Sequence, residues 1–188
     1  MAAILDGPAT TARAWDVLDD EKLYEIIDGE KVETPPLSAR ATRVASDLAV
    51  ALTVYGMANN IGKAYPEMLV QLPLPMDRRR RPDVIFVPFS RFPRDTEVPD
   101  TNEWAILPDV FIEVVSPSDF ADEVETKKIE YFLAGGRQVW IVYPRHQTIY
   151  VQDSDGRVRR LTRADTLDGG EVLPGFRLPL AEVFPAQS

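Results

Sequence analysis

The chain has 188 residues, no cysteine, a single histidine (His146) and a formal net charge of −9 at pH 7. These counts exclude disulfides, thiolate metal sites and a histidine-rich zinc site, so any bound metal would be held mainly by oxygen atoms, which favours Mg²⁺ or Mn²⁺. The acidic charge argues against a general nucleic-acid coat protein, although it does not exclude a nuclease, whose metal site is itself acidic.

The length suits one domain with a full hydrophobic core, which we expect to span residues 1–188. Residues 1–18 lack the basic and apolar regions of a signal peptide, and we expect a loosely ordered or accessory segment there. No apolar run approaches the roughly 20 residues that cross a bilayer. We therefore expect a cytoplasmic protein with no membrane partner.

The first predicted element is a hairpin, with strands at residues 23–27 and 30–33 around an Asp28-Gly29 turn. Apolar residues then recur at helical spacing through residues 38–58. This spacing predicts one amphipathic helix, and Ser38 is a candidate for its N-terminal cap.

Two strands are predicted next, at residues 68–72 and 84–87, paired around a turn rich in proline and arginine. The turn holds four consecutive arginines, residues 78–81, and a second basic cluster lies within residues 157–163. Either cluster could contact a polyanion, and the alternative for both is a solvated turn or strand. Residues 88–103, rich in proline, aspartate and threonine, predict a loop.

A carboxylate interrupts the most apolar strand, predicted at residues 110–115. Burying an unpaired carboxylate is costly, so Glu113 must be ligated, paired or protonated. Asp83 opens the strand at residues 84–87 and could share a cation with Glu113 if the two strands are neighbours. The alternative is that Glu113 pairs with a buried arginine.

A helix is predicted directly after this strand. Ser116-Pro117-Ser118-Asp119 is typical of a helix start, and Gly135-Gly136 predicts its end. Lys127 lies on the stripe that faces the core, but Lys128 lies close to that stripe as well. Periodicity therefore leaves both lysines open as partners of the carboxylates, and the alternative for either is a solvated lysine.

An apolar strand at residues 138–143 follows with short links, which predicts a crossover between adjacent parallel strands. A further hairpin is predicted at residues 148–151 and 158–161. Together these elements predict an α/β (α+β) fold with a central mixed β-sheet, flanking helices and additional β-hairpins.

Several of these motifs, in this order, resemble the large bacterial family of putative restriction endonucleases within the PD-(D/E)xK superfamily. They are Pro82-Asp83, IEVVSPSD with Glu113, K-x-x-x-Y at Lys127 and Tyr131, GGRQVWIVYP, and the opening YEIIDGEKVE with Glu25. The resemblance covers about residues 20–185. It implies a restriction endonuclease-like fold.

The resemblance also implies a metal-dependent endonuclease that hydrolyses DNA phosphodiester bonds with Mg²⁺ or Mn²⁺ and no organic cofactor. Asp83 and Glu113 would be catalytic residues and metal ligands. The lysine that usually follows the glutamate by two residues is replaced by Val115, and the resemblance assigns its role to Lys127. This lysine would orient or deprotonate the attacking water and stabilise charge on the phosphorane.

Further expectations concern the surroundings of this site. Glu25 and Asp109 are candidates for supporting roles, and Arg80 and Arg81 for contacts with DNA. The resemblance implies a homodimer. Family members often carry a histidine where this chain has Ala41. That difference and the acidic charge leave open a non-catalytic nucleic-acid-binding or regulatory protein, or an interaction domain with salt-bridged acids.

Overall fold

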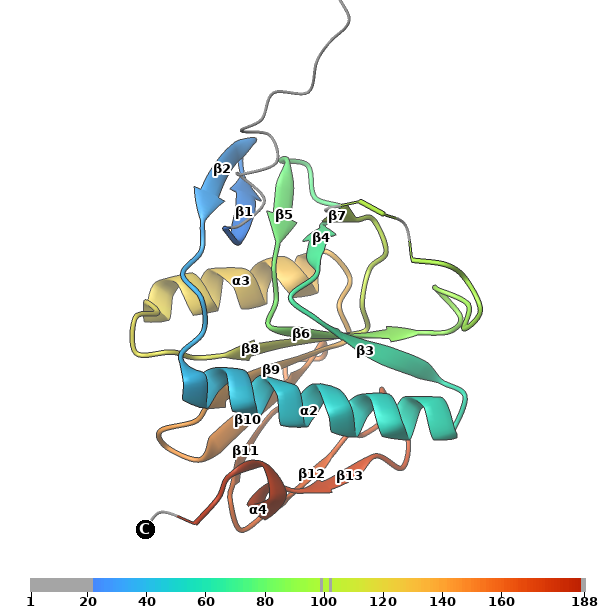
Figure 1. Cartoon of the computed structure of the whole chain (residues 1–188), viewed down its shortest axis with the longest axis vertical. Coiled ribbons are helices and arrows are strands. Elements are labelled where there is room, and N and C mark those ends of the chain that lie inside the picture. The colour runs from blue at the N-terminus through green and yellow to red at the C-terminus, as the bar shows by residue number, and fades with distance from the viewer. Residues whose placement is uncertain (1–21, 99, 102, 187–188) are drawn as a thin grey trace, which may run out of the picture.

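The computed structural model describes residues 22–98, 100–101 and 103–186, which form two β-sheets, a small ribbon and three helices (Figure 1). The strands of the central sheet are β3 (Gly62–Pro66), β6 (Val84–Pro88), β8 (Val110–Val114), β9 (Gln138–Tyr143), β10 (Thr148–Asp153) and β11 (Val158–Thr162). Their order is β11-β10-β9-β8-β6-β3. Because β8 and β9 are parallel and the other pairs are antiparallel, the predicted mixed sheet is confirmed.

A second sheet lies above the first in the view of Figure 1. Its strands are β1 (Tyr24–Ile27), β2 (Glu30–Glu33), β4 (Leu69–Gln71), β5 (Arg78–Arg80) and β7 (Glu103–Trp104), in the order β2-β1-β5-β4-β7. The small ribbon pairs β12 (Thr166–Asp168) with β13 (Arg177–Pro179). The helices are α2 (Ala39–Ala58), α3 (Ala121–Leu133) and α4 (Leu180–Val183).

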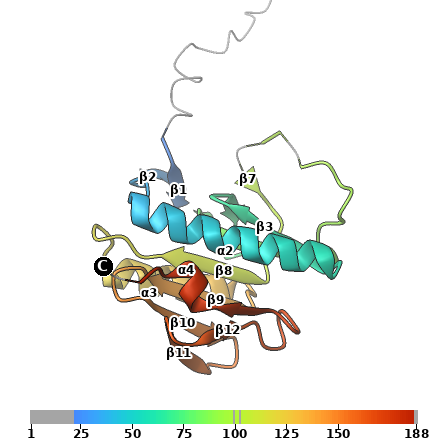
Figure 2. The ribbon, with the colours of Figure 1, turned by 60° about the horizontal axis from the view of Figure 1, so that its bottom comes forward.

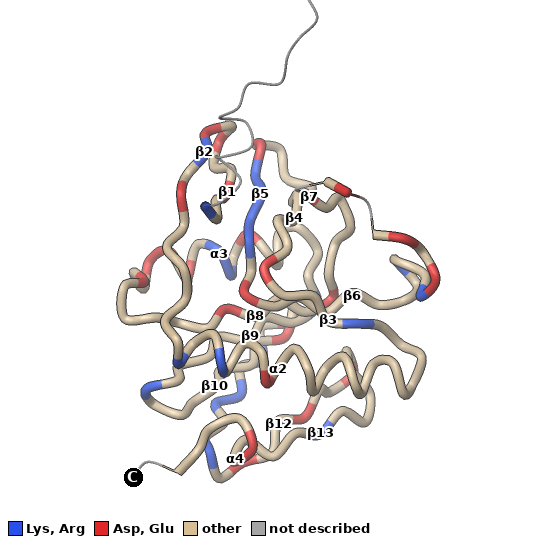
Figure 3. Tube along the Cα trace, in the orientation of Figure 1, with Lys and Arg blue, Asp and Glu red and all other residues tan. Residues whose placement is uncertain are grey.

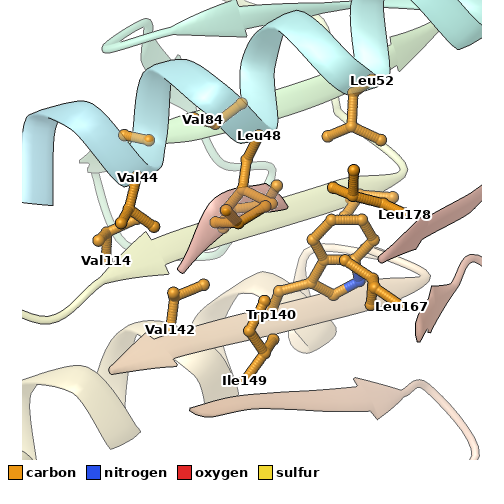
Figure 4. Packing of buried hydrophobic residues seen from close by; sticks show 14 of the residues in the cluster. Val44, Leu48, Leu52, Val84, Val114, Trp140, Val142, Ile149, Leu167 and Leu178 are labelled. Carbon is orange, nitrogen blue, oxygen red and sulfur yellow. The ribbon is translucent and has the colours of Figure 1, made fainter. Parts of the chain in front are cut away.

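The central sheet is covered on both faces (Figures 1 and 2). Helix α2, α4 and the β12–β13 ribbon pack on one face, where Leu48 and Leu52 of α2 lie over Trp140 of β9 (Figure 4). Helix α3 and the second sheet cover the other face, where Tyr131 and Phe111 are buried together. Strand β8 is therefore buried on both sides, as its apolar sequence predicts.

Three local predictions are confirmed. The first hairpin forms as expected, because Asp28 and Gly29 both have positive φ, the geometry of a tight two-residue turn. Helix α2 begins after Ser38, whose side chain accepts a hydrogen bond from the amide of Ala41. The hairpin of β10 and β11 also forms. The accessory segment expected at residues 1–18 lies outside the described residues.

The predicted pairing of residues 68–72 with 84–87 is wrong. Strand β4 pairs with β5, which is part of the arginine run itself, and β6 pairs with β3 and β8. The run is a strand because Arg78 and Arg80 alternate into the interior and find carboxylate partners there, while Arg79 lies between them on the other face.

The predicted helix start within residues 116–119 is also wrong, because α3 begins at Ala121 after Phe120. The residues before it form a turn in which the Asp119 carboxylate accepts a hydrogen bond from the Ser116 amide. The predicted end is confirmed, with Gly135 in the left-handed region at φ 101°. In the described part of the chain, none of the helices has the length and hydropathy needed to cross a membrane.

Candidate active site

Two of the predicted site residues face each other across neighbouring strands. Val84 of β6 is paired with Ile112 of β8 in antiparallel register, so the next facing positions are Asp83 and Glu113. Facing residues of an antiparallel pair point to the same side of the sheet. The Asp83 carboxylate also accepts a hydrogen bond of 2.5 Å from the Val114 amide, which holds it beside Glu113.

Helix α3 supplies two groups to Glu113 from successive turns. The Lys127 ammonium lies 3.6 Å from Oε2 of Glu113, and the Tyr131 hydroxyl donates a hydrogen bond to Oε1. The Tyr131 ring is stacked on Phe111 of β8 with 4.1 Å between ring centroids, which fixes the helix over the strand. Lys128 instead pairs with Glu125 on the helix surface, so the geometry selects Lys127.

Glu25 of β1 joins the site from the second sheet. Its Oε1 lies 2.9 Å from the Lys127 ammonium, and its Oε2 lies 2.7 Å from the Arg80 guanidinium. The side chain of Glu25 is only 1% exposed. The Lys127 ammonium therefore lies between Glu25 and Glu113, and the expected supporting role of Glu25 stays a prediction.

The arginine strand β5 builds the layer behind Glu25. The Arg80 guanidinium, 3% exposed, binds Glu25 and lies 2.6 Å from Glu130 of α3, and Arg78 lies 3.1 Å from the same Glu130. A guanidinium enclosed in this way cannot reach DNA. The expectation that Arg80 contacts DNA is therefore wrong, and Arg80 instead ties the second sheet to α3.

Arg81 differs from Arg80, because it lines the cavity at the site. Its amide donates to Glu25, and its guanidinium donates to the backbone carbonyls of Tyr24 and Glu67. The guanidinium of Arg81 is thus partly engaged at the cavity wall, and its contact with DNA stays a prediction.

Asp109 lies apart from this group. It precedes β8 by one residue, four positions before Glu113, and its carboxylate pairs with Arg91 at 3.0 Å and Arg137 at 3.1 Å. It does not line the cavity that holds Asp83 and Glu113. The partners of Asp109 lie at the opposite end of the strand, so its expected supporting role stays a prediction without a contact to Asp83 or Glu113.

Burial dominates the electrostatics of the two facing carboxylates. Burial, with the nearby Glu113 charge, raises the pKa of Asp83 to about 8. Burial likewise raises the pKa of Glu113 above its usual value, although Lys127 and the Tyr131 hydroxyl oppose this. A bound cation would relieve the cost of ionising both groups.

Lys127 and Glu25 form a neighbouring ion pair in which both charged forms are favoured. Burial alone would lower the pKa of Lys127, but Glu113 and Glu25 outweigh it and raise the pKa well above the usual range. Burial alone would raise the pKa of Glu25, but Lys127 and Arg80 lower it overall. Lys127 is therefore a fixed ammonium and Glu25 a fixed carboxylate at neutral pH.

A cavity of about 180 Å³ opens over these groups. Its charged lining residues are Glu67, Arg81, Asp83, Glu113, Asp119, Glu123 and Lys127. Exposed Phe120 stands at the same wall. The space exceeds that of a single water molecule several-fold, so it can hold a cation with its water ligands or a phosphate group.

The donor set fits a hydrated oxygen-binding cation. Among the described residues there is no group of three or more acidic, histidine or cysteine side chains arranged to hold a metal ion. Mg²⁺ keeps several waters and commonly binds proteins through one or two carboxylates together with substrate phosphates. Asp83 and Glu113 face each other at the cavity, and both have raised pKa values. They therefore match the two carboxylates that a hydrated Mg²⁺ commonly uses.

Sequence reasoning missed Glu130, which neutralises Arg78 and Arg80, and gave Tyr131 no role beyond its place in a motif. A signal for Glu130 exists, because alternating arginines in a strand require buried acids opposite them. The signal for Tyr131 is its spacing, since a residue four positions after Lys127 lies on the same helix face.

Comparisons with known proteins agree with this architecture. A family model described as "Uma2: Putative restriction endonuclease" matches residues 11–181. The chain is similar to a solved structure described as "a putative nuclease belonging to DUF820 from Anabaena variabilis ATCC 29413". The TM-score is 0.75 at 20% sequence identity, and the match covers 87% of this chain and 90% of the other. None of the curated proteins matches the chain.

Proposed function

This chain belongs to the Uma2 family, described as "Putative restriction endonuclease", and from that premise we propose that it is a metal-dependent endonuclease that hydrolyses DNA phosphodiester bonds. The observation that carries the proposal is the meeting of Asp83, Glu113 and Lys127 at one cavity of a restriction endonuclease-like fold. Two facing carboxylates could hold a catalytic cation, and a fixed ammonium could stabilise charge on the phosphorane, so the three groups suit metal-dependent phosphodiester hydrolysis.

Asp83 and Glu113 would hold Mg²⁺ or Mn²⁺ through their carboxylate oxygens. When bound, such a cation lowers the pKa of water and neutralises charge on the scissile phosphate. The Val114 amide and the Tyr131 hydroxyl each hold one of these carboxylates in place. The chain therefore presents both groups with their orientation already set.

Lys127 acts as a cation rather than as a base. Its raised pKa keeps the ammonium protonated, so it cannot accept a proton from water at neutral pH. An ammonium has three N–H donors, and Glu25 and Glu113 engage two of its sides. The third can donate to the attacking water or to a phosphate oxygen, where the charge stabilises the phosphorane.

The test is cleavage of supercoiled plasmid in Mg²⁺ or Mn²⁺ by the wild type and by the Asp83→Asn and Glu113→Gln variants. We expect each substitution to lower the cleavage rate by about 10²-fold or more, because each removes a ligand charge. The matched control is Asp109→Asn, another buried carboxyl next to β8 that does not face the cavity. Its rate should stay near the wild-type rate.

The result that overturns the site assignment is cleavage that survives both site substitutions. DNA binding by the wild type without turnover in either metal would instead support a non-catalytic nucleic-acid-binding or regulatory protein. The homodimer implied by the resemblance remains part of the proposal, and the molar mass measured by light scattering in solution tests it.

A further inference from the structure

A second charged feature lies outside the candidate active site. Arg40 and Arg43, three positions apart at the start of α2, share a hollow with Arg145 from the turn between β9 and β10. We call it the arginine hollow. Its described lining contains these three arginines and no carboxylate side chain. In a chain with a net charge of −9, a hollow whose charged lining residues are all arginines is unexpected.

The arginines of this hollow are mostly free of partners. Among the described residues the side chains of Arg40 and Arg145 make no hydrogen bond or ion pair, and both are exposed. Arg43 lies 3.4 Å from Asp47, but both side chains are substantially exposed, and such a pair is weak. These guanidinium groups therefore remain available to an external anion, in contrast to the enclosed Arg80.

The position of Arg40 is unfavourable for the helix itself. The first turn of α2 contains no acidic residue, and Arg40 lies in it. A cation there opposes the helix dipole and is unfavourable. A residue that is unfavourable for its own helix and has no partner within the protein tends to mark a functional position. The cost is recovered when an anion binds, because the dipole and the arginines then attract the same charge.

The arginine hollow adjoins the candidate active site. Leu37 lines the cavity of Asp83 and Glu113, and Ala39 lines the arginine hollow, so one short segment borders both. The Ser38 amide lies 3.4 Å from the hydroxyl of Ser116, which follows β8. Figure 3 shows basic residues at the start of α2 and at the turn after β9, at the edge of the sheet where the parallel strands β8 and β9 both end.

We propose that the arginine hollow binds backbone phosphates of a DNA strand whose scissile phosphate occupies the cavity of Asp83 and Glu113. This inference rests on the proposed function. Arginine binds phosphate oxygens through two parallel N–H groups, and contacts of this kind position a strand without reading its bases. The hollow would thus give sequence-independent affinity beside a catalytic centre that is otherwise acidic.

The experiment measures binding of a labelled DNA duplex to the metal-free protein, so that no cleavage is needed. The variant carries Arg40→Gln and Arg145→Gln, and the control carries Arg94→Gln and Arg177→Gln, which remove two exposed charges outside both basic clusters. We expect the first pair to weaken binding on the order of tenfold and to reduce the slope of log affinity against log salt by about 2. The control should change neither quantity.

The other outcomes show whether the inference alone fails or the proposed function fails as well. If the Arg40 and Arg145 variant binds DNA as the wild type does, the inference is overturned, while cleavage by the wild type would leave the proposed function standing. If inorganic phosphate at matched phosphate concentration displaces the duplex fully, the hollow binds free anions and the inference is again overturned. If the wild type neither binds nor cleaves DNA, the proposed function fails and the inference fails with it.

Discussion

At the scale of single residues, Glu113 shows how this chain keeps a carboxylate inside a strand. One carboxylate oxygen accepts a hydrogen bond from the Tyr131 hydroxyl, and the other faces the Lys127 ammonium. Both partners come from one face of α3. Each partner is itself fixed, Tyr131 by stacking on Phe111 and Lys127 by Glu25. The orientation of Glu113 is thus set before any ligand arrives.

Substitution of Lys127 tests the catalytic assignment of the lysine. In Lys127→Met the cleavage rate should fall by roughly 10²–10³-fold, because a preorganised charge at the phosphorane is lost. Lys128→Met is the matched control, since this neighbour pairs with Glu125 on the helix surface. The rates are measured under single turnover with excess enzyme. Equal losses in both variants would show that the geometry does not select Lys127.

At the scale of elements, β5 explains how a strand of arginines can be part of the interior. Arg80 bridges Glu25 of β1 and Glu130 of α3, so the strand joins the second sheet to the helix that carries Lys127. Arg79 points the other way, toward Asp77 and Glu103, and stays partly exposed. The two neighbours therefore have the same chemistry and different roles.

Removing the buried guanidinium should unfold the protein more readily than removing the exposed one. Arg80→Met leaves Glu25 and Glu130 without their shared partner, and breaking such a buried pair costs about 3–5 kcal/mol. Arg79→Met removes a partly exposed pair, which contributes about 0–1 kcal/mol. Urea denaturation followed by circular dichroism measures both. A smaller loss for Arg80→Met than for Arg79→Met would contradict the proposed bridge.

The same elements explain what sequence reasoning can reach. Glu113 and the turn at Asp28-Gly29 were predictable, because an acid within an apolar strand and a turn dipeptide are local signals. Strand β5 was not predictable, because a run of arginines can be a buried strand only when acids distant in sequence, such as Glu25 and Glu130, form ion pairs with it. Residues 116–119 suggested a helix start, but the Asp119 carboxylate accepts a hydrogen bond from the Ser116 amide in a turn, and the helix begins only at Ala121.

At the scale of the whole molecule, the candidate site links stability to pH, and the proposed metal would extend this link to Mg²⁺. Burial and the Glu113 charge raise the pKa of Asp83 from 3.8 to about 8. Between these values the folded protein holds a proton that the unfolded chain has released. The contribution of Asp83 to stability therefore falls as pH rises through this window in the absence of metal.

A comparison of the wild type with Asp83→Asn isolates this effect, because asparagine can still accept the hydrogen bond from Val114 and has no carboxyl to ionise. Without metal, the stability of the variant relative to the wild type should increase as pH rises from about 4 to about 8 and then level off. Asp122→Asn, an exposed acid of α3, serves as the control. Thermal melts across this pH range give the difference, and parallel curves would contradict the raised pKa.

Added Mg²⁺ should counteract the loss of wild-type stability that accompanies rising pH. At low pH the cation must displace the proton on Asp83, so it should raise the melting temperature little, whereas above pH 8 it should raise it clearly. Asp83→Asn should show no such pH-dependent gain, because one of the two ligand charges is absent. A gain of equal size in both proteins at every pH would mean that Mg²⁺ binds elsewhere. This measurement needs no substrate, and so it tests the metal site even if cleavage is never observed.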